Sequence, residues 1–257
     1  MRLRRSMSGE RHGNAIPSFE EMFTINFANE DIEALREALS DMQSVVKVEA
    51  YLSKDESCYT CFQTLKLLKI LRELSPSLNG RKAIELEIYY VEEHKDVFLK
   101  RGIYRVPTIR LLNGYITYLG MPAGEEIKAF IETLIRLSNG DHGLSSRALK
   151  ALQDLEHDIL LEVIVTPICP YCPYAALLAN MVAYASTIYG TSSIRSVVIE
   201  AYENPDIADK YGITVVPTIV INGHVAFMGY PPNEMQLIDA ILRYAKRQNK
   251  ADVEIES

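Results

Sequence analysis

The chain has 257 residues, of which 48% are apolar and 24% charged, which is typical of a globular protein large enough for two domains. Its net charge of −7 lacks the basic excess that nucleic-acid binding needs. No apolar run reaches the roughly 18–20 residues that span a bilayer. Residues 1–11 are Arg-rich without the apolar core of a secretory signal, so we expect a disordered extension over 1–20 and a cytoplasmic protein.

The first half of the sequence alternates helical and strand patterns. In chain order we expect a helix over 29–41, a strand over 45–53, a helix over 61–74, a strand over 83–91, a short helix over 95–101, a hairpin turn at Asn113-Gly114 and a closing helix over 124–137. Asn-Gly is a strong signal for a tight hairpin turn. Strands that alternate with helices predict an α/β sheet, to which the hairpin adds antiparallel strands.

The second half repeats this order. We expect a helix over 145–156, a strand over 159–166, a helix over 172–189, a strand over 196–201, a short helix over 205–211, a hairpin turn at Asn222-Gly223 and a helix over 233–247. The polar, turn-rich stretch 138–143 lies between the halves. An internal repeat of this length predicts two tandem α/β units, over 21–140 and 141–248, followed by an acidic tail over 249–257.

All four cysteines fall in two Cys-x-x-Cys pairs, Cys58/Cys61 and Cys169/Cys172, which lie 111 residues apart. A long chain with so few, clustered cysteines favours chemistry or metal binding over structural disulfides. Two cysteines three apart at the start of a helix share one face and are close enough to bridge. The helix N-terminus favours a thiolate, so we predict that Cys58 and Cys169 attack and that Cys61 and Cys172 resolve the mixed disulfide.

A Val-Pro-Thr sequence follows each cysteine pair at nearly the same distance. Pro107 lies 49 residues after Cys58, and Pro217 lies 48 residues after Cys169. The order of strand, Cys-x-x-Cys, helix, strand, helix, Val-Pro-Thr and hairpin resembles the thioredoxin fold, and here it occurs twice. The fold class we expect is therefore α/β with two tandem thioredoxin-fold units, each a mixed central sheet flanked by helices.

The doubled arrangement over roughly 20–248 resembles the protein disulfide oxidoreductases of thermophilic archaea and bacteria, relatives of protein disulfide isomerase, and Cys-Pro-Tyr-Cys at 169–172 resembles glutaredoxins. The resemblance implies reduction, oxidation and isomerisation of protein disulfides, no cofactor in the chain, and a thioredoxin-reductase-like flavoprotein as partner. It also implies that Pro107 and Pro217 follow cis peptide bonds, beside which an exposed backbone edge can pair with a substrate peptide. Because intracellular disulfides are rare outside hyperthermophiles, we expect a thermophilic source.

An acidic residue recurs in the strand before each cysteine pair, at Glu49 and Glu162. One interpretation is a partly buried carboxylate that accepts the proton of the resolving cysteine, because desolvation raises a carboxyl pKa towards neutrality. The other is a structural acid that pairs with a neighbour such as Lys47.

Three alternatives remain open at this point. Four thiolates could bind zinc, although zinc ribbons separate their pairs by about 15–20 residues. The chain could be a dedicated electron donor to a peroxiredoxin, although the doubled donor domains that it resembles normally keep cysteines in one unit. It could also be a chaperone or binding module. The first pair, Cys-Tyr-Thr-Cys at 58–61, lacks the intervening proline of reductive relatives.

Overall fold

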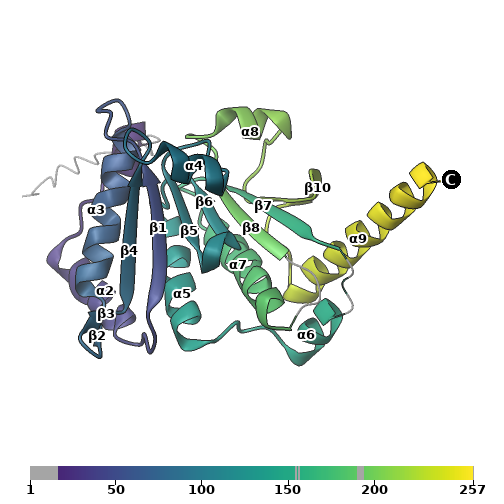
Figure 1. Cartoon of the computed structure of the whole chain (residues 1–257), viewed down its shortest axis with the longest axis horizontal. Helices are drawn as coiled ribbons and strands as arrows, with labels where there is room; N and C mark the ends of the chain where they lie inside the picture. Colours follow the sequence, from purple (N-terminus) through teal and green to yellow (C-terminus); the bar gives the residue numbers. More distant parts are fainter. Residues whose placement is uncertain (1–16, 154, 156, 190–193, 257) are drawn as a thin grey trace, which may run out of the picture.

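The computed structural model describes residues 17–153, 155, 157–189 and 194–256, with side chains described as far as residue 246 (Figure 1). The first half of the chain contains two short N-terminal helices and then a strand and helix that flank the first cysteine pair. Its elements are α1 (Phe19–Phe23), α2 (Asn29–Leu39), β1 (Val46–Leu52), α3 (Tyr59–Leu74), β2 (Ser77–Leu78), β3 (Arg81–Lys82), β4 (Ile84–Tyr90), α4 (Lys95–Arg101), β5 (Thr108–Leu111), the 3₁₀ turn η1 (Leu112–Gly114), β6 (Ile116–Leu119) and α5 (Glu126–Asn139).

The second half repeats this order, as the sequence predicts. Its elements are α6 (Ser146–Gln153), β7 (Ile159–Val165), α7 (Cys172–Tyr189), β8 (Ile194–Glu200), α8 (Pro205–Lys210), β9 (Thr218–Ile221), β10 (His224–Met228) and α9 (Glu234–Glu256). At the second predicted hairpin, Asn222 and Gly223 both have positive φ, of 47° and 78°, which a tight hairpin turn requires.

The two units share one continuous sheet. Its eight strands run in the order β10-β9-β7-β8-β6-β5-β1-β4. Within each unit a parallel pair, β1 with β4 or β7 with β8, is extended by an antiparallel hairpin. The units join where β6 of the first pairs in parallel with β8 of the second. As a result β8 has a neighbour on both sides, whereas its counterpart β4 is an edge strand.

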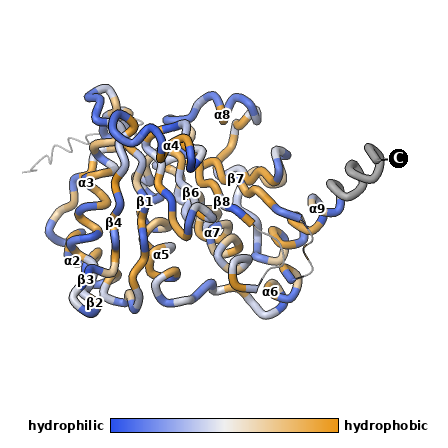
Figure 2. The backbone as a smooth tube through the Cα atoms, viewed as in Figure 1, coloured by the Kyte–Doolittle hydropathy of each residue, from blue (hydrophilic) through white to orange (hydrophobic). Residues whose placement is uncertain are grey.

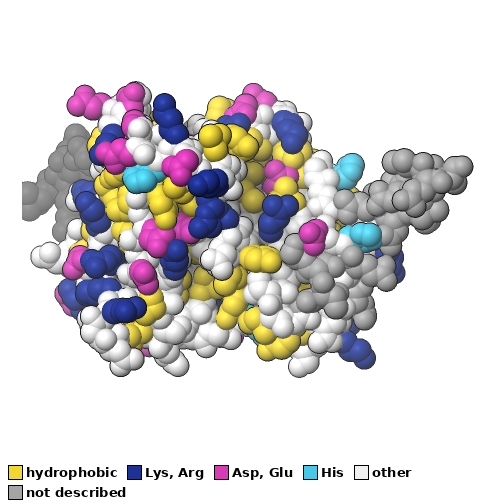
Figure 3. Space-filling view, viewed as in Figure 1, with side chains coloured by type: hydrophobic (Ala, Val, Ile, Leu, Met, Phe, Trp, Pro, Cys, Tyr) yellow, Lys and Arg dark blue, Asp and Glu magenta, His cyan; other side chains and the backbone are white. Residues whose placement is uncertain are grey.

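The helices cover the two faces of the sheet unequally. On one face α5 and α7 pack together, and Asn180 of α7 donates hydrogen bonds to Tyr118 of β6 and Thr133 of α5 and accepts one from Ser196 of β8. This buried polar network ties the two units to each other. On the opposite face, charged side chains gather around α4 and the neighbouring strands (Figure 3). Hydrophobic residues run along the central strands, and hydrophilic residues predominate in the loops at their upper ends (Figure 2).

Two expectations concern the chain ends, and the structure describes only part of each range. The predicted disordered extension over 1–20 is described only from residue 17, and there Ser18 caps α1 through a capping box with Glu21, so the helix starts at Phe19. The predicted tail over 249–257 is helical as far as Glu256, since α9 meets no glycine or proline that would end it. None of the described helices is both long and apolar enough to cross a membrane.

Candidate redox site

The first cysteine pair lies where β1 ends and α3 begins. Cys58 is the N-cap residue of α3, and Cys61 lies one turn into the helix, with their Cα atoms 5.3 Å apart and a disulfide between them. Cys58 is partly exposed, whereas Cys61 is 1% exposed and its Sγ accepts a hydrogen bond of 3.3 Å from the Ser53 amide. The exposed sulfur at the helix start can meet a substrate, and the buried one cannot.

The second pair repeats this geometry after β7. Cys169 and Cys172 also form a disulfide, with Cα atoms 5.5 Å apart. Here α7 begins at Cys172, whose amide points at Cys169 Sγ at 3.2 Å. Cys169 is 7% exposed and Cys172 is fully buried. A helix-terminal N–H directed at the first sulfur is the arrangement that stabilises a thiolate there.

Both Val-Pro-Thr sequences lie beside their cysteines. The peptide bonds Val106–Pro107 and Val216–Pro217 are cis, and Cys169 Sγ lies 3.7 Å from the carbonyl oxygen of Val216. Each proline directly precedes a strand of the hairpin, β5 or β9. The loop before each strand therefore bends at its cis-proline, and in the second unit its backbone carbonyl lies against the disulfide.

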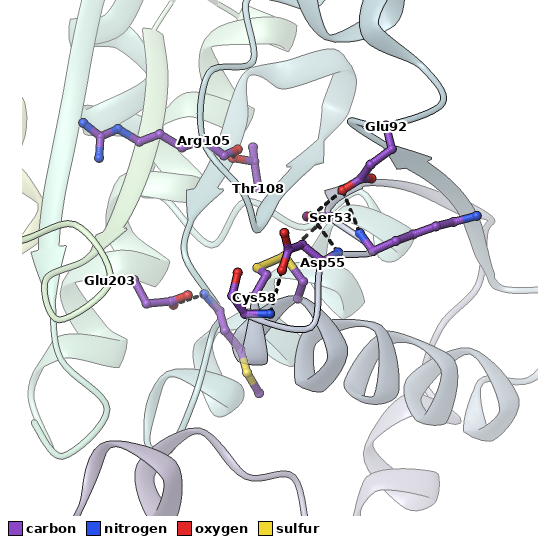
Figure 4. The surroundings of a disulfide bond; sticks show 11 residues. Ser53, Asp55, Cys58, Glu92, Arg105, Thr108 and Glu203 are labelled. Atoms are coloured by element: carbon purple, nitrogen blue, oxygen red, sulfur yellow. Dashed lines mark hydrogen bonds between the residues drawn. A yellow bond between two sulfur atoms is a disulfide. The ribbon is translucent and has the colours of Figure 1, made fainter.

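The first site is surrounded by polar and acidic groups (Figure 4). The Ser53 hydroxyl donates a short hydrogen bond to Glu92 and accepts the amide of Asp55 at 3.0 Å, and the Cys58 amide donates to the Asp55 carbonyl at 3.0 Å. From the other flank the carboxyl of Glu203, which belongs to the second unit, accepts a hydrogen bond from the Met121 amide on the side of the site where Cys58 lies. The hydrogen bond from Ser53 holds the pKa of Glu92 below its usual value.

The second site has an apolar rim instead. Large side chains around Cys169 remain exposed, namely Ile168 at 45%, Tyr171 at 65%, Tyr174 at 60% and Val215 at 49%. The ring of Tyr174 lies 6.0 Å from that of Tyr230, which extends the patch. Exposed aromatic clusters of this kind mark surfaces that contact other proteins.

Three carboxyl groups that the sequence analysis did not select lie at the junction of the units. Glu126 of α5 and Glu200 of β8 are 1% and 3% exposed, and burial raises the pKa of each to about 8. Burial also raises the pKa of Glu203, and the nearby Thr60 side chain and the hydrogen bond from the Met121 amide lower it in part. These groups come together only through the pairing of β6 with β8, so no local sequence signal marks them.

Glu49 and Glu162 do not meet the cysteines. Glu49 is buried and lies within 4 Å of three cations, Lys47 at 3.7 Å, Arg101 at 3.3 Å and Arg110 at 3.9 Å. Four residues of extended strand, about 13 Å, separate Glu49 from Ser53 beside Cys61. Glu162 accepts a hydrogen bond of 2.7 Å from Tyr211. These contacts favour the structural interpretation of both acids.

The zinc alternative requires ligands from both pairs to converge. Each pair instead closes its own disulfide in its own unit. Within the described ranges no group of three or more histidine, cysteine or acidic side chains could hold a metal ion.

Comparison with known proteins identifies the arrangement. The thioredoxin domain family matches residues 44–132 and 160–243, one segment in each unit. A protein disulfide oxidoreductase from Aeropyrum pernix K1 is 43% identical, covering 88% of this chain and 97% of that one, with a TM-score of 0.83. The chain belongs to the protein disulfide oxidoreductases of the thioredoxin-domain family.

Two further relatives place this protein disulfide oxidoreductase among its neighbours. A thioredoxin from Methanocaldococcus jannaschii is 40% identical over 83 residues, which are 32% of this chain and 92% of the thioredoxin. The N-terminal domain of the alkylhydroperoxide reductase AhpF from Enterococcus faecalis has a TM-score of 0.71 at 18% identity, covering 84% of this chain and 100% of that one. The second likeness is one of fold alone. The predicted α/β class with two thioredoxin-fold units is thus confirmed, and the protein is a thiol–disulfide oxidoreductase acting on protein disulfides.

Proposed function

We propose that each cysteine pair catalyses dithiol–disulfide exchange, with Cys58 and Cys169 as nucleophiles. The thiolate attacks one sulfur of a substrate disulfide, forms a mixed disulfide and releases the first substrate thiolate, which takes up a proton. The buried partner, Cys61 or Cys172, then attacks the nucleophile's sulfur and releases the second substrate thiolate. Two electrons pass from the pair to the substrate, and oxidation of a substrate dithiol is the same sequence in reverse.

The single observation that carries the proposal is the position of each pair at a helix start, with the first cysteine at the terminus and the second buried in the helix. In the first unit Cys58 is partly exposed at the N-cap while Cys61 is buried, and in the second the Cys172 amide points at the Cys169 sulfur. Only the first cysteine of each pair can be reached from solvent, and only it has the helix terminus to stabilise its thiolate.

The substrate peptide pairs with the backbone edge before each cis-proline. In the second unit the Val216 carbonyl lies 3.7 Å from Cys169 Sγ, and an extended peptide can add to this backbone, and to the matching backbone before Pro107, as a further strand. The contacts of Glu49 and Glu162 do not support a proton-acceptor role, and the proposed mechanism does not use them.

We place the protein in the cytoplasm, and the clustering of all four cysteines in two redox pairs supports this location. The two units extend over 21–140 and 141–248. The family supports a thioredoxin-reductase-like flavoprotein as the electron donor. A peroxiredoxin is the alternative electron acceptor, which a peroxide-reduction assay with a purified peroxiredoxin would reveal.

Reduction of insulin disulfides tests the proposal. Replacing both nucleophiles, Cys58→Ser with Cys169→Ser, is expected to abolish turnover, whereas each single variant retains the activity of the intact site. Cys61→Ser and Cys172→Ser are expected to accumulate a mixed disulfide with insulin that dithiothreitol releases. Full activity in the double nucleophile variant would refute the proposed catalysis.

A further inference from the structure

The first redox site is not built from the first unit alone. The chain leaves β6 at Leu119 and passes Gly120 and Met121 over the end of β8, where the second unit turns at 201–204. There the carboxyl of Glu203 accepts the Met121 amide at 2.5 Å, and the Thr60 side chain lies close enough to the same carboxyl to lower its pKa. Thr60 lies between the two cysteines of the first pair and is 6% exposed. A side chain of the second unit therefore reaches the Cys-Tyr-Thr-Cys loop.

The space around this carboxyl leaves no room for a side chain at position 120. Gly120 has φ +95°, and a Cβ there would lie 2.6 Å from Glu203 Oε2 and 2.7 Å from Glu200 Cβ. Only glycine lets the first unit approach the carboxyl this closely. Asn204 strengthens the same contact, because its side chain donates to the Leu119 carbonyl at 3.2 Å.

The repeat offers an internal comparison. Glu93 occupies the position of Glu203 in the first unit, after β4, but β4 is an edge strand and the Glu93 side chain is 49% exposed and paired with Lys54. In the second site, Tyr171 takes the place of Thr60 and is 65% exposed, with no carboxyl over it among the described contacts. The close carboxyl is thus a feature of the first site only.

We propose that Glu203 of the second unit is a positioning residue of the first redox site, which holds the Cys-Tyr-Thr-Cys loop through Thr60 and makes the Cys58 thiol less acidic. A negative charge near a thiol disfavours its thiolate. Because stabilising the thiolate stabilises the reduced pair, Glu203 makes the Cys58/Cys61 pair more reducing than it would be alone. This inference rests on the proposed exchange chemistry at Cys58.

Other charges around the site bear on the same thiol. They are Asp55 and Glu56 on the preceding loop, Lys54 paired with Glu93, Glu92 held by Ser53, Arg105 paired with Asp206, and Glu200 behind Glu203. Among the described side-chain contacts, Glu203 lies against a residue between the cysteines and these other charges do not. The substitution Glu203→Gln removes the charge and keeps an oxygen that can accept the Met121 amide and the Thr60 hydroxyl.

The test uses the full chain with Cys169→Ser and Cys172→Ser, so that only the first pair exchanges. The pKa of Cys58 is read from the rate of iodoacetamide alkylation against pH, and the stability of the dithiol from its equilibrium with glutathione. Glu203→Gln is expected to lower the thiol pKa by about half a unit to one unit, and to shift the equilibrium toward the dithiol by about three- to tenfold. Glu93→Gln in the same background is the matched control and is expected to stay within about twofold of the parent.

The second pair provides the remaining control. With Cys58→Ser and Cys61→Ser, Glu203→Gln is expected to leave the glutathione equilibrium of Cys169/Cys172 unchanged. An unaltered alkylation profile of Cys58 in Glu203→Gln, or an equal shift in both pairs, would overturn the inference. If the chains that keep only one cysteine pair, with Glu203 intact, do not reduce insulin, the proposed function is refuted instead. The two failures are therefore distinguishable.

Discussion

The two Cys-x-x-Cys sites lie at the same place in their units but have different neighbours. Around the first are Asp55, Glu92 and Glu203, which are polar or acidic, and the residue before its second cysteine, Thr60, is buried. Around the second are Ile168, Tyr171 and Tyr174, all exposed and apolar or aromatic. The helix start, the buried resolving cysteine and the cis-proline are shared.

Part of the difference lies in the sequence, since Ile168, Tyr171 and Tyr174 stand where the first unit has Ser57, Thr60 and Gln63. The rest follows from the way the units join. Because β8 pairs with β6, the turn after β8 lies against the first site, where Glu200 at the end of the strand is buried and Glu203 in the turn is partly buried. The corresponding turn after β4 lies at the edge of the sheet and stays in solvent. Two units with the same order of cysteines, cis-proline and hairpin therefore have chemically different sites, and the junction accounts for the acidic contact at the first.

The largest effect that we expect from this difference is in substrate choice. A chain that keeps only Cys58/Cys61 should prefer cationic peptides, and one that keeps only Cys169/Cys172 should prefer apolar peptides, because charge complementarity raises the association rate. We expect kcat/KM ratios for a lysine-rich and a leucine-rich disulfide peptide to differ by about tenfold or more between the two chains at low salt. Fluorescence dequenching of the peptides measures the rates.

The salt dependence of the rates tests whether charge complementarity causes the peptide preference of the first site. Raising the ionic strength from about 0.01 to about 1 M shortens the Debye length from about 30 Å to about 3 Å and should remove most of the preference of the first site only. Equal peptide preferences for the two chains at low salt would break the comparison, and so would a preference of the first site that does not change with salt.

The shared parts of the sites could be predicted from the sequence, and the different parts could not. The cysteine pairs, the prolines and the hairpins recur at fixed spacing, so the repeat itself predicts them. Glu203 and Glu93 occupy equivalent repeat positions and look alike in sequence, and the pairing of β6 with β8 brings only Glu203 into contact with the other unit. For the same reason Glu49 looked like a candidate proton acceptor, since strand periodicity does not show that Arg101 and Arg110 face it.

The buried carboxyls at the junction predict a pH dependence of stability. In the folded chain the pKa of Glu126 is raised to about 8, from an unfolded value of about 4.3. The folded state therefore holds a proton that the unfolded state has lost, so the free energy of unfolding falls as the pH rises through this window. At pH values above both the folded and the unfolded pKa, each unit of difference between them lowers the free energy of unfolding by about 1.4 kcal/mol. We expect Glu126→Gln to gain stability relative to the parent between about pH 6 and about pH 9, by at least about 1 kcal/mol.

Urea unfolding at several pH values measures this change. Glu125→Gln is the matched control, because Glu125 is adjacent but partly exposed and paired with Lys128. Because the Glu125 charge is only the last of the causes that raise the Glu126 pKa, the unfolding curve of Glu125→Gln is expected to lie much closer to that of the parent than the curve of Glu126→Gln does. Parallel pH profiles for Glu126→Gln and the parent would show that the pKa of Glu126 is not raised. The burial of this carboxyl would then have no effect on the pH dependence of stability.

The smallest effect that we expect concerns the loop before Pro107. Arg105 donates to Asp206 of the second unit at 2.9 Å, and the Thr108 hydroxyl donates to the Arg105 carbonyl at 2.7 Å. The second unit therefore holds the backbone before Pro107, with which we propose that a substrate peptide pairs. Both ionic side chains are well exposed, and such a pair contributes about 0.2–1 kcal/mol. Asp206→Asn should therefore raise KM about two- to threefold at the first site and leave the second unchanged. Asp96→Asn is the control, because Asp96 holds the equivalent position in the first unit and pairs with Lys100 of its own helix. If Asp206→Asn affects both sites equally, the pair stabilises the whole junction instead of positioning one loop.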